Sequence, residues 1–375
     1  MADASAPLAK KPEWQPRFWE GANFSTWFRH LWVNRFAVHW SLWYIAIIAT
    51  IITLFNSVMR GVQWLFYGGA IRRAELQGPP IFIIGHWRTG TTFLHELMIQ
   101  DPRFGFPNTY QCISPNHFLL TETVLSKLLW FLMPKERPMD RMKLGFDRPQ
   151  EDEFALCLLG ARSPYSAIAF PNRPPMDAEY LDFDGVPLER IERWKGILLW
   201  FLKAVTLRQK KRLVLKSPPH TARIKTLNEL FPEAIFINII RDPYVVFPST
   251  MNLWRSLHQS HGLQKPNCEG LEDRVFNTFL RMHERLEEGK KLIAPGRYFE
   301  MRYEDLVKNP HETLRNVYEH FHLGEWETMR TRLDAYLATV KNYETNKYQL
   351  PPEQRALIAA RWGEIIRRQG YSENP

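Results

Sequence analysis

The chain of 375 residues is 45% hydrophobic, which is enough for one large domain with additional segments. Its net charge of +9 comes from basic residues scattered along the chain. This pattern argues against a nucleic-acid-binding protein and suits a polyanionic nucleotide or an anionic membrane surface. Three widely spaced cysteines, and histidines without metal-ligand spacing, argue against a disulfide framework and a zinc site and favour a reducing compartment.

Residues 36–59 carry no formal charge and predict an apolar helix. Such a helix would be about 36 Å long, enough to cross a hydrocarbon core of about 30 Å. Polar residues within it, such as His39 and Asn56, leave open a second interpretation, a buried helix that packs on the rest of the chain. A mixed-charge stretch precedes the run and no small-residue cleavage site follows it, so it is not a signal peptide.

Seven of the fourteen tryptophans precede residue 65 and resemble the aromatic belt of a membrane interface. More Lys and Arg precede the apolar run than follow it, which by itself would place the amino terminus in the cytoplasm and the rest outside. The later sequence, however, has no N-x-[ST] acceptor and its cysteines look unpaired. We therefore expect a membrane-associated protein whose N-terminal helix or hairpin dips into the membrane from the cytoplasmic side.

A glycine-containing loop, Gly85-His-Trp-Arg-Thr-Gly-Thr-Thr92, lies between a predicted buried strand at 79–84 and a predicted helix at 93–98. In this context the backbone N–H groups of the loop point at an anion beside the positive end of a helix. Thr91 stands where a triphosphate-binding loop has lysine, so Arg88 is the nearest cation and ordinary ATP chemistry is doubtful. The alternative is a turn that binds nothing.

Two strongly apolar segments, 124–133 and 197–207, predict helices between this loop and the following strands. Core packing would explain them, and so would a hydrophobic mouth that faces the bilayer. Four prolines within 164–175 predict an irregular loop that could act as a lid.

A second buried strand, predicted at 233–240, ends at Arg241 and is followed by a helix. Asp242 and Pro243 are good helix-starting residues, but they do not account for Arg241. This cation falls at the carboxyl end of a strand, where open α/β sheets bind ligands. With Ser249, nearly two turns along the helix, it could hold a second phosphate. Two anion sites suit a nucleotide phosphorylated at both ends of its ribose.

Four motifs in register together resemble the sulfotransferase family, in its membrane-associated bacterial branch related to tyrosylprotein and carbohydrate sulfotransferases. They are Arg88-Thr-Gly-Thr-Thr92, Leu215-Lys-Ser-Pro218, Arg241-Asp-Pro243 with Ser249, and Arg302-Tyr-Glu-Asp-Leu306. The resemblance covers about residues 80–322. It implies an α/β fold, a P-loop-like parallel β-sheet flanked by helices. We expect an N-terminal helical membrane-associating segment at 1–75 and a sulfotransferase catalytic domain at 76–375.

The resemblance implies transfer of a sulfuryl group from 3′-phosphoadenosine 5′-phosphosulfate (PAPS), without a metal ion, to a hydroxyl or amine. The 5′-phosphosulfate would be held by Arg88, Thr89, Gly90, Thr91 and Thr92. Arg241 and Ser249 would hold the 3′-phosphate, and Phe93 and Tyr303 match positions near the adenine. The late Arg-Lys-Gly nucleotide segment of cytosolic members has no counterpart here. The apolar N-terminal segment indicates a lipid-like, glycan or other membrane-borne acceptor.

Sulfuryl transfer needs in-line positioning and stabilisation of spread-out charge, which fixed cations can supply. Besides Arg88, the resemblance makes Lys216 the second cation, placed at a strand end to stabilise the sulfonate or the leaving oxygen. The acceptor also needs a base. The candidates are Glu153, in the acidic start of a helix, and His220; we prefer Glu153. Each could instead serve to start a helix.

Two other classes of protein are consistent with parts of the pattern. A P-loop kinase-like phosphotransferase would share the loop and the fold, with Asp242 as its metal ligand, and would bind ATP with magnesium. A catalytically silent membrane scaffold would bind no nucleotide.

Overall fold

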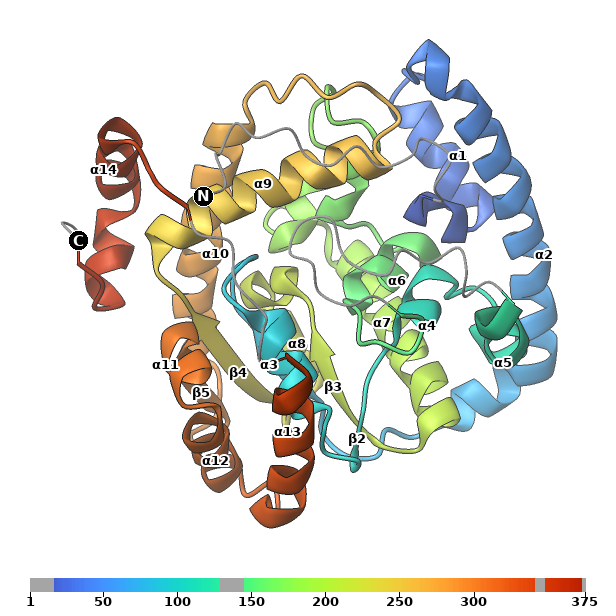
Figure 1. Ribbon diagram of the computed structural model, residues 1–375. Coiled ribbons are helices and arrows are strands. Elements are labelled where there is room, and N and C mark those ends of the chain that lie inside the picture. The colour runs from blue at the N-terminus through green and yellow to red at the C-terminus, as the bar shows by residue number, and fades with distance from the viewer. Residues whose placement is uncertain (1–16, 129–144, 341–347, 373–375) are drawn as a thin grey trace.

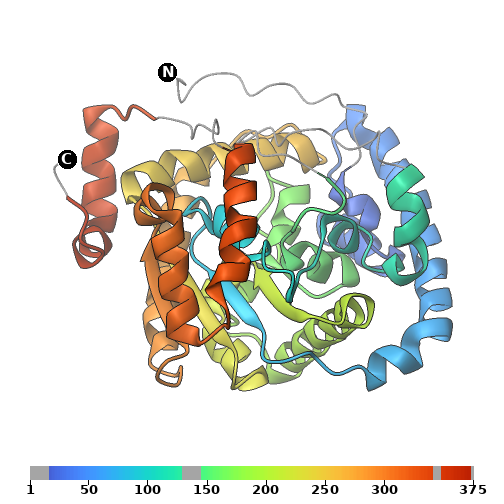
Figure 2. The same cartoon turned by 60° about the horizontal axis from the view of Figure 1, so that its bottom comes forward.

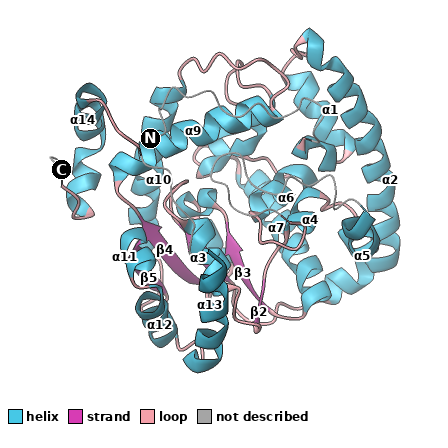
Figure 3. Ribbon diagram, viewed as in Figure 1, coloured by secondary structure: helices cyan, strands magenta, loops and turns pink. Residues whose placement is uncertain are grey.

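A parallel β-sheet lies at the centre of the computed structural model, which describes residues 17–128, 145–340 and 348–372. Helices cover both faces of this sheet (Figures 1 and 3). The strands are β1 (Ile81–Ile84), β2 (Phe104–Gly105), β3 (Arg212–Lys216), β4 (Ile235–Ile240) and β5 (Tyr298–Arg302). Their order is β2-β3-β1-β4-β5, and each neighbouring pair is parallel. The α/β fold expected from the sequence is confirmed.

The strand register brings four connections to one edge of the sheet. Ile83 of β1 pairs with Lys216 of β3, and Ile240 of β4 pairs with Arg302 of β5. Because all strands are parallel, the glycine loop, Lys216, Arg241 and Tyr303 all lie at or just beyond carboxyl ends at this edge. Strands β2 and β3 lie on one side of β1, and β4 and β5 lie on the other. The carboxyl end of β1 is therefore a switch point, where such sheets bind ligands.

The remaining elements surround this sheet. The α-helices are α1 (Phe24–Val33), α2 (Trp43–Arg73), α3 (Thr91–Met98), α4 (Thr109–Ile113), α5 (Phe118–Leu128), α6 (Asp152–Leu159), α7 (Leu188–Gln209), α8 (Ile224–Leu230), α9 (Pro243–His261), α10 (Leu271–Lys290), α11 (Tyr303–Lys308), α12 (Pro310–Phe321), α13 (Trp326–Val340) and α14 (Pro352–Arg368). The 3-10 helices are η1 (Phe18–Gly21), η2 (Trp40–Leu42), η4 (Pro164–Ala169), η5 (Ala178–Leu181) and η6 (Pro218–Ala222).

The apolar N-terminal helix begins later and ends later than the expected range 36–59. Arg35 and Phe36 have positive φ angles of 53° and 51°, so the chain turns there before η2 and α2. Helix α2 continues past Arg60 to Arg73 and runs along one side of the molecule in two views (Figures 1 and 2). By length and composition, the stretch Trp40–Arg73 could cross a membrane.

The N-terminal tryptophans divide into two groups. Trp19 and Trp27 are buried in a hydrophobic core that also contains Ala46 and Ala49 of α2, so they are not part of an interfacial belt. The exposed group is Trp32, Trp40, Trp43 and Trp64. Trp14 lies outside the described residues.

The prediction of an irregular, lid-like loop at 164–175 is wrong for the first half of this range. Pro164 opens the 3-10 helix η4, and Ser163 caps this helix by accepting a hydrogen bond from the backbone N–H of Tyr165. Tyr165 and Ile168 are buried in the core, so this part is fixed. Of the two apolar segments, 197–207 lies within α7, and 124–128 is the end of α5; residues 129–133 fall outside the described residues.

Candidate active site

The glycine loop adopts a backbone that only small or strained residues allow. Gly85, Arg88 and Gly90 have φ angles of 144°, 71° and 101°. A Cβ at Gly90 would lie 2.2 Å from Cδ2 of Tyr303, and one at Gly85 would lie 2.6 Å from the carbonyl oxygen of Ile239. Left-handed residues next to a helix start form the kind of concave turn that holds anions. The loop therefore fits a phosphate or sulfate group.

Four residues from distant parts of the chain meet beside this loop. Nε of Arg88 donates to Oγ of Ser249 at 2.8 Å. Arg241 donates from Nη1 to the carbonyl oxygen of Arg88 at 3.1 Å, and its guanidinium lies over the Tyr303 ring at 4.1 Å from the centroid. The guanidinium groups of Arg88 and Arg241 and the Ser249 hydroxyl therefore lie in one site. This proximity is what the prediction of one nucleotide with two anionic ends requires.

The other loop residues take different positions. The Thr89 hydroxyl donates to the carbonyl oxygen of His86 at 2.8 Å and so holds the loop in shape. Thr91 and Thr92 form the first turn of α3, where N–H groups lack helical acceptors. Phe93 is half-buried and packs against the hydrophobic cluster that contains Tyr303.

Three consecutive acids at the start of α6 each pair with a different basic residue near the end of β3. Glu151 pairs with Lys216, Asp152 with His220, and Glu153 with Arg223. The order along one segment matches the order along the other. A single contact between α6 and the β3–η6–α8 connection therefore positions three acid–base pairs, but only one of the three acids is accessible.

Glu151 is that acid. Its side chain is 15% exposed, and Nζ of the buried Lys216 lies 2.7 Å from Oε1. The Tyr165 hydroxyl donates to Oε2 at 2.5 Å and itself accepts from the Trp87 indole N–H at 2.9 Å. Because Trp87 precedes Arg88, this chain of hydrogen bonds connects the acid directly to the glycine loop.

Asp152 and His220 form a buried structural pair. Nε2 of His220 donates to Oδ2 of Asp152 at 2.7 Å, and the Ser217 hydroxyl donates to Oδ1 at 2.8 Å. Burial would raise the pKa of the Asp152 carboxyl, but His220 and Ser217 together lower this pKa below its usual value. Both side chains have 0% exposure, so His220 lacks the access that a catalytic base needs.

Glu153 occupies a similarly closed position, which corrects the preference for it as base. Its carboxylate and the Arg223 guanidinium are both 0% exposed and form a two-pronged ion pair at 2.5 and 2.9 Å. The Ser163 hydroxyl donates to the same carboxylate at 2.6 Å. A carboxylate held by a permanent cation and closed to solvent cannot reach an acceptor. The geometry favours Glu151 in its place.

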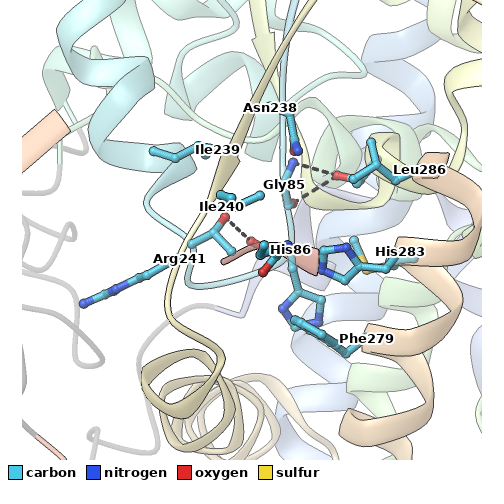
Figure 4. A pocket seen from close by; sticks show the side chains of 13 residues that line it. Gly85, His86, Asn238, Ile239, Ile240, Arg241, Phe279, His283 and Leu286 are labelled. Carbon is cyan, nitrogen blue, oxygen red and sulfur yellow. Dashed lines mark hydrogen bonds between the residues drawn. The ribbon is translucent and has the colours of Figure 1, made fainter. Parts of the chain in front are cut away.

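A small cavity lies behind the glycine loop and is lined by residues including His86, Asn238, Phe279 and His283 (Figure 4). The Arg241 side chain points away from the two histidines (Figure 4). Burial lowers the pKa of the His86 imidazole to about 4, so the ring is neutral at physiological pH. Gly85, Thr89 and Arg241 also line this cavity, so it adjoins the residues that are candidates for holding an anionic donor.

No metal centre is evident within the described ranges, since none of their His, Cys, Asp and Glu residues gather in groups of three or more that could hold an ion. The cations near the glycine loop are Arg88, Arg241 and Lys216, the residues that the sequence made candidates for an anionic substrate.

A family model described as the sulfotransferase family matches residues 79–328, the part of the chain that carries the sheet and all of these groups. The chain belongs to the sulfotransferase family. Over 371 residues it is 47% identical to the omega-hydroxy-beta-dihydromenaquinone-9 sulfotransferase Stf3 of Mycobacterium bovis and to that of Mycobacterium tuberculosis. Each alignment covers 99% of this chain and 95% of the relative.

Solved sulfotransferases share the fold. The sulfotransferase STF9 from Mycobacterium avium matches with a TM-score of 0.67 and 19% identity, over 94% of this chain and 97% of that one. STF1 from Mycobacterium tuberculosis matches with a TM-score of 0.56 and 18% identity, over 84% and 86%. At these identities the likeness concerns the fold alone.

Three residues around this site were not among the candidates predicted from the sequence. Trp87 lies in the glycine loop but has no anion-binding chemistry of its own, and Tyr165 and Arg223 lie outside the motifs. The contacts of all three are with partners far along the chain. The acidic start of α6 was visible in the sequence. Its helical spacing alone could not tell which of the three acids stays accessible.

Proposed function

We propose that the chain transfers the sulfuryl group of PAPS to the hydroxyl of a lipid-like, membrane-borne acceptor. The observation that carries the proposal is the meeting of Arg88, Arg241 and Ser249 at the loop, with Lys216 and Glu151 joined to the same loop through Trp87. Family membership supports sulfotransfer. The relatives named for an omega-hydroxylated menaquinone support a hydroxyl on a long isoprenoid lipid as the acceptor class.

In this proposal the two ends of the donor are held separately. Arg88 and the loop residues Thr89–Thr92 bind the 5′-phosphosulfate, while Arg241 and Ser249 bind the 3′-phosphate. The Tyr303 ring, packed against Gly90, lies beside the adenosine, and Phe93 stays a candidate for the adenine site. The Arg88–Ser249 hydrogen bond joins the 5′-phosphosulfate subsite to the 3′-phosphate subsite, so one donor molecule can contact both.

The transfer step uses the Glu151–Lys216 pair. The oxygen of the acceptor hydroxyl forms the new bond to sulfur, and Glu151 accepts the proton of that hydroxyl. The bond between sulfur and the bridging phosphate oxygen breaks, and adenosine 3′,5′-bisphosphate leaves. Lys216 stabilises negative charge on the sulfonate and the leaving oxygen, and Tyr165 holds the Glu151 carboxylate in place. The products are a sulfate ester and the bisphosphate.

The kinase alternative has less support. Thr91 still stands in the position of the phosphate-binding lysine, and Asp242 is used as the N-cap of α9, where it accepts from the N–H of Tyr244 at 2.9 Å. Burial also raises the pKa of the Asp242 carboxyl, which weakens it as a metal ligand.

The proposal is tested with purified protein and labelled PAPS. In the presence of EDTA, we expect label to appear in an omega-hydroxylated menaquinone presented in vesicles, and none in the same lipid without the hydroxyl. Adenosine 3′,5′-bisphosphate should raise the melting temperature without metal, whereas ATP with magnesium should not. Stabilisation by ATP with magnesium alone would contradict sulfotransfer and favour the kinase.

We also propose that the catalytic domain faces the cytoplasm, where PAPS is made. In sealed right-side-out vesicles from cells that express the chain, added protease should leave the catalytic domain intact. In inverted vesicles it should be cleaved. Cleavage in the right-side-out vesicles would overturn this sidedness.

A further inference from the structure

Helices α1 and α2 present a broad apolar face to solvent. On α2, the side chains of Ile51, Leu54, Phe55, Val58, Leu65 and Phe66 are between 48% and 72% exposed. Trp32, Val33 and Trp40, from α1 and η2, add 65%, 50% and 80% exposed side chains at its end. We call these nine residues the apolar face. Soluble monomers rarely expose contiguous apolar patches of this kind, so the face indicates a surface that is covered in the cell.

The opposite side of α2 contacts the rest of the protein near the start, in the middle and in the second half of the helix. Near its start, Ala46 and Ala49 are buried in the core. In the middle, the buried Asn56 side chain donates to the carbonyl oxygens of Glu20 and Ala22 at 2.6 and 2.9 Å and accepts from Nε2 of His117, in the catalytic domain, at 3.1 Å.

The second half of α2 is held in the same way. The buried Gln63 side chain accepts from the backbone N–H of Leu119 at 2.9 Å, and Ile71 belongs to the main core around the sheet. Lys203 of α7 donates to the carbonyl oxygen of Arg72 at 3.1 Å. A helix that crossed a bilayer would have to carry these domain contacts into hydrocarbon or break them. Their distribution therefore argues against a crossing.

The charged residues of the segment that carries the apolar face are all positive, and this indicates which kind of surface it binds. The sequence has no Asp or Glu between Glu20 and Glu75, while Arg35, Arg60, Arg72 and Arg73 are exposed. Arginines with long apolar stems can lie against a membrane and reach its head groups. A protein partner would be expected to offer carboxylates to these arginines, but a surface this apolar with only positive charge matches an anionic lipid leaflet better.

We propose that α1 and α2 lie in the plane of an anionic membrane leaflet, with the apolar face immersed at the boundary of the acyl chains and neither helix crossing the bilayer. Helices of this type enter the interface by about 5–10 Å, which is a side chain's depth. The attachment is monotopic: the domain rests on one leaflet through the outer side of a helix whose inner side is part of the core.

In this arrangement the membrane surface lies near the proposed active site. Ala46 and Ala49, on the inner side of α2, share one hydrophobic cluster with Trp87 and Tyr165, the two residues that lead to Glu151. An acceptor whose tail stays in the leaflet would need to move only its hydroxyl end toward this cluster. This consequence rests on the proposed function, whereas the attachment itself does not.

The attachment is tested with full-length protein and neither donor nor acceptor present, so its outcome is independent of activity. We expect flotation with vesicles of phosphatidylcholine and phosphatidylglycerol, weakened by salt and by omission of phosphatidylglycerol. The double variant Ile51→Glu/Val58→Glu should bind at least about tenfold more weakly, because two apolar side chains lose their burial. Leu292→Glu, at a 50% exposed position after α10, is the matched control and should bind like the parent protein. Equal binding by all three would overturn the proposal.

The depth of α2 separates an in-plane helix from a spanning one. Single nitroxide-labelled cysteines at Tyr44, Phe55 and Leu65 would be compared in a Cys268→Ser background, since Cys112 and Cys157 are buried. An in-plane helix predicts the same shallow depth at all three positions. A spanning helix predicts that Phe55 lies about 15 Å deep, near the bilayer centre, and this result would overturn the proposal. So would a stable dimer in solution whose labels stay shielded from lipid.

Discussion

The Lys216 ammonium group and the Glu151 carboxylate lie 2.7 Å apart at the carboxyl edge of the sheet, and the Glu151 side chain is 15% exposed. Asp152 and Glu153, the next two residues, pair with His220 and Arg223, and all four of these side chains have 0% exposure. Tertiary structure thus gives three adjacent carboxylates different uses. The first stays partly exposed, and the other two hold α6 against the segment that follows β3.

Replacing Glu151 by glutamine is expected to lower kcat by about 10²–10⁴-fold with little change in the affinity for adenosine 3′,5′-bisphosphate. The amide cannot take the acceptor proton, although it keeps the size of the side chain. Steady-state rates and calorimetric titration of the bisphosphate measure the two quantities. An unaltered kcat would remove Glu151 from the mechanism.

Replacing Lys216 by methionine is expected to reduce turnover far more than donor affinity. The positive charge matters most as charge develops on the leaving oxygen, while the ground state is held by the loop and Arg88. Single-turnover rates and equilibrium binding of the bisphosphate should be compared. Equal losses in rate and affinity would assign Lys216 to ground-state binding instead.

Replacing Ser249 by alanine is expected to weaken binding of adenosine 3′,5′-bisphosphate by roughly tenfold, since one hydrogen bond to a charged group is lost. Binding of adenosine 5′-phosphate, which has no 3′-phosphate, should change much less. Competition titrations with both nucleotides measure this selectivity. If both affinities drop together, Ser249 acts only by orienting Arg88 through their 2.8 Å hydrogen bond.

Replacing Arg223 by methionine is expected to destabilise the fold by about 3–5 kcal/mol, because the Glu153 carboxylate would be left buried without its cation. Glu153→Gln should also lower stability, and the double variant should lose less than the sum of the two. Chemical denaturation provides the free energies. If Glu153→Gln instead kept full stability and abolished turnover, the original choice of Glu153 as base would be restored.

The buried His86 is expected to make the fold sensitive to mild acid. Its folded-state pKa of about 4 lies below the ordinary value of 6.5, so the unfolded chain binds more protons between these values. Stability from this group is therefore complete above about pH 6.5 and falls as pH drops toward 4, by up to about 3 kcal/mol. Denaturation of the parent and of His86→Asn across this range should show a shallower pH dependence in the variant. Parallel curves would contradict the assignment.

Much of the proposed nucleotide site could be predicted from the sequence, because its residues lie at recognisable strand ends. A buried strand followed by a glycine loop or by Arg-Asp-Pro needs only neighbouring residues to form, and parallel strands bring such junctions to one edge. The structure accordingly places Arg88 within hydrogen-bonding distance of Ser249, which lies 161 positions away. Their proposed contacts with PAPS stay predictions.

The base could not be chosen in the same way. Glu151, Asp152 and Glu153 have the same chemistry at adjacent positions, and their difference arises from what α6 packs against. Tyr165 of η4 binds the Glu151 carboxylate, and Arg223 at the start of α8 pairs with Glu153. These contacts distinguish the acids from one another. No pattern within the α6 segment encodes those contacts.

The sequence by itself determined the fold class, the glycine loop between a buried strand and a helix, and an apolar N-terminal helix, because strand burial, glycine placement and an apolar run are properties of short stretches. Only the tertiary structure decided which acid is accessible and which side of α2 packs against the rest of the protein. Both depend on which side of a helix meets the rest of the chain. Asn56 and Gln63 weaken a membrane span when counted along the sequence, but in the folded chain their hydrogen bonds join α2 to the domain and leave its apolar side outward.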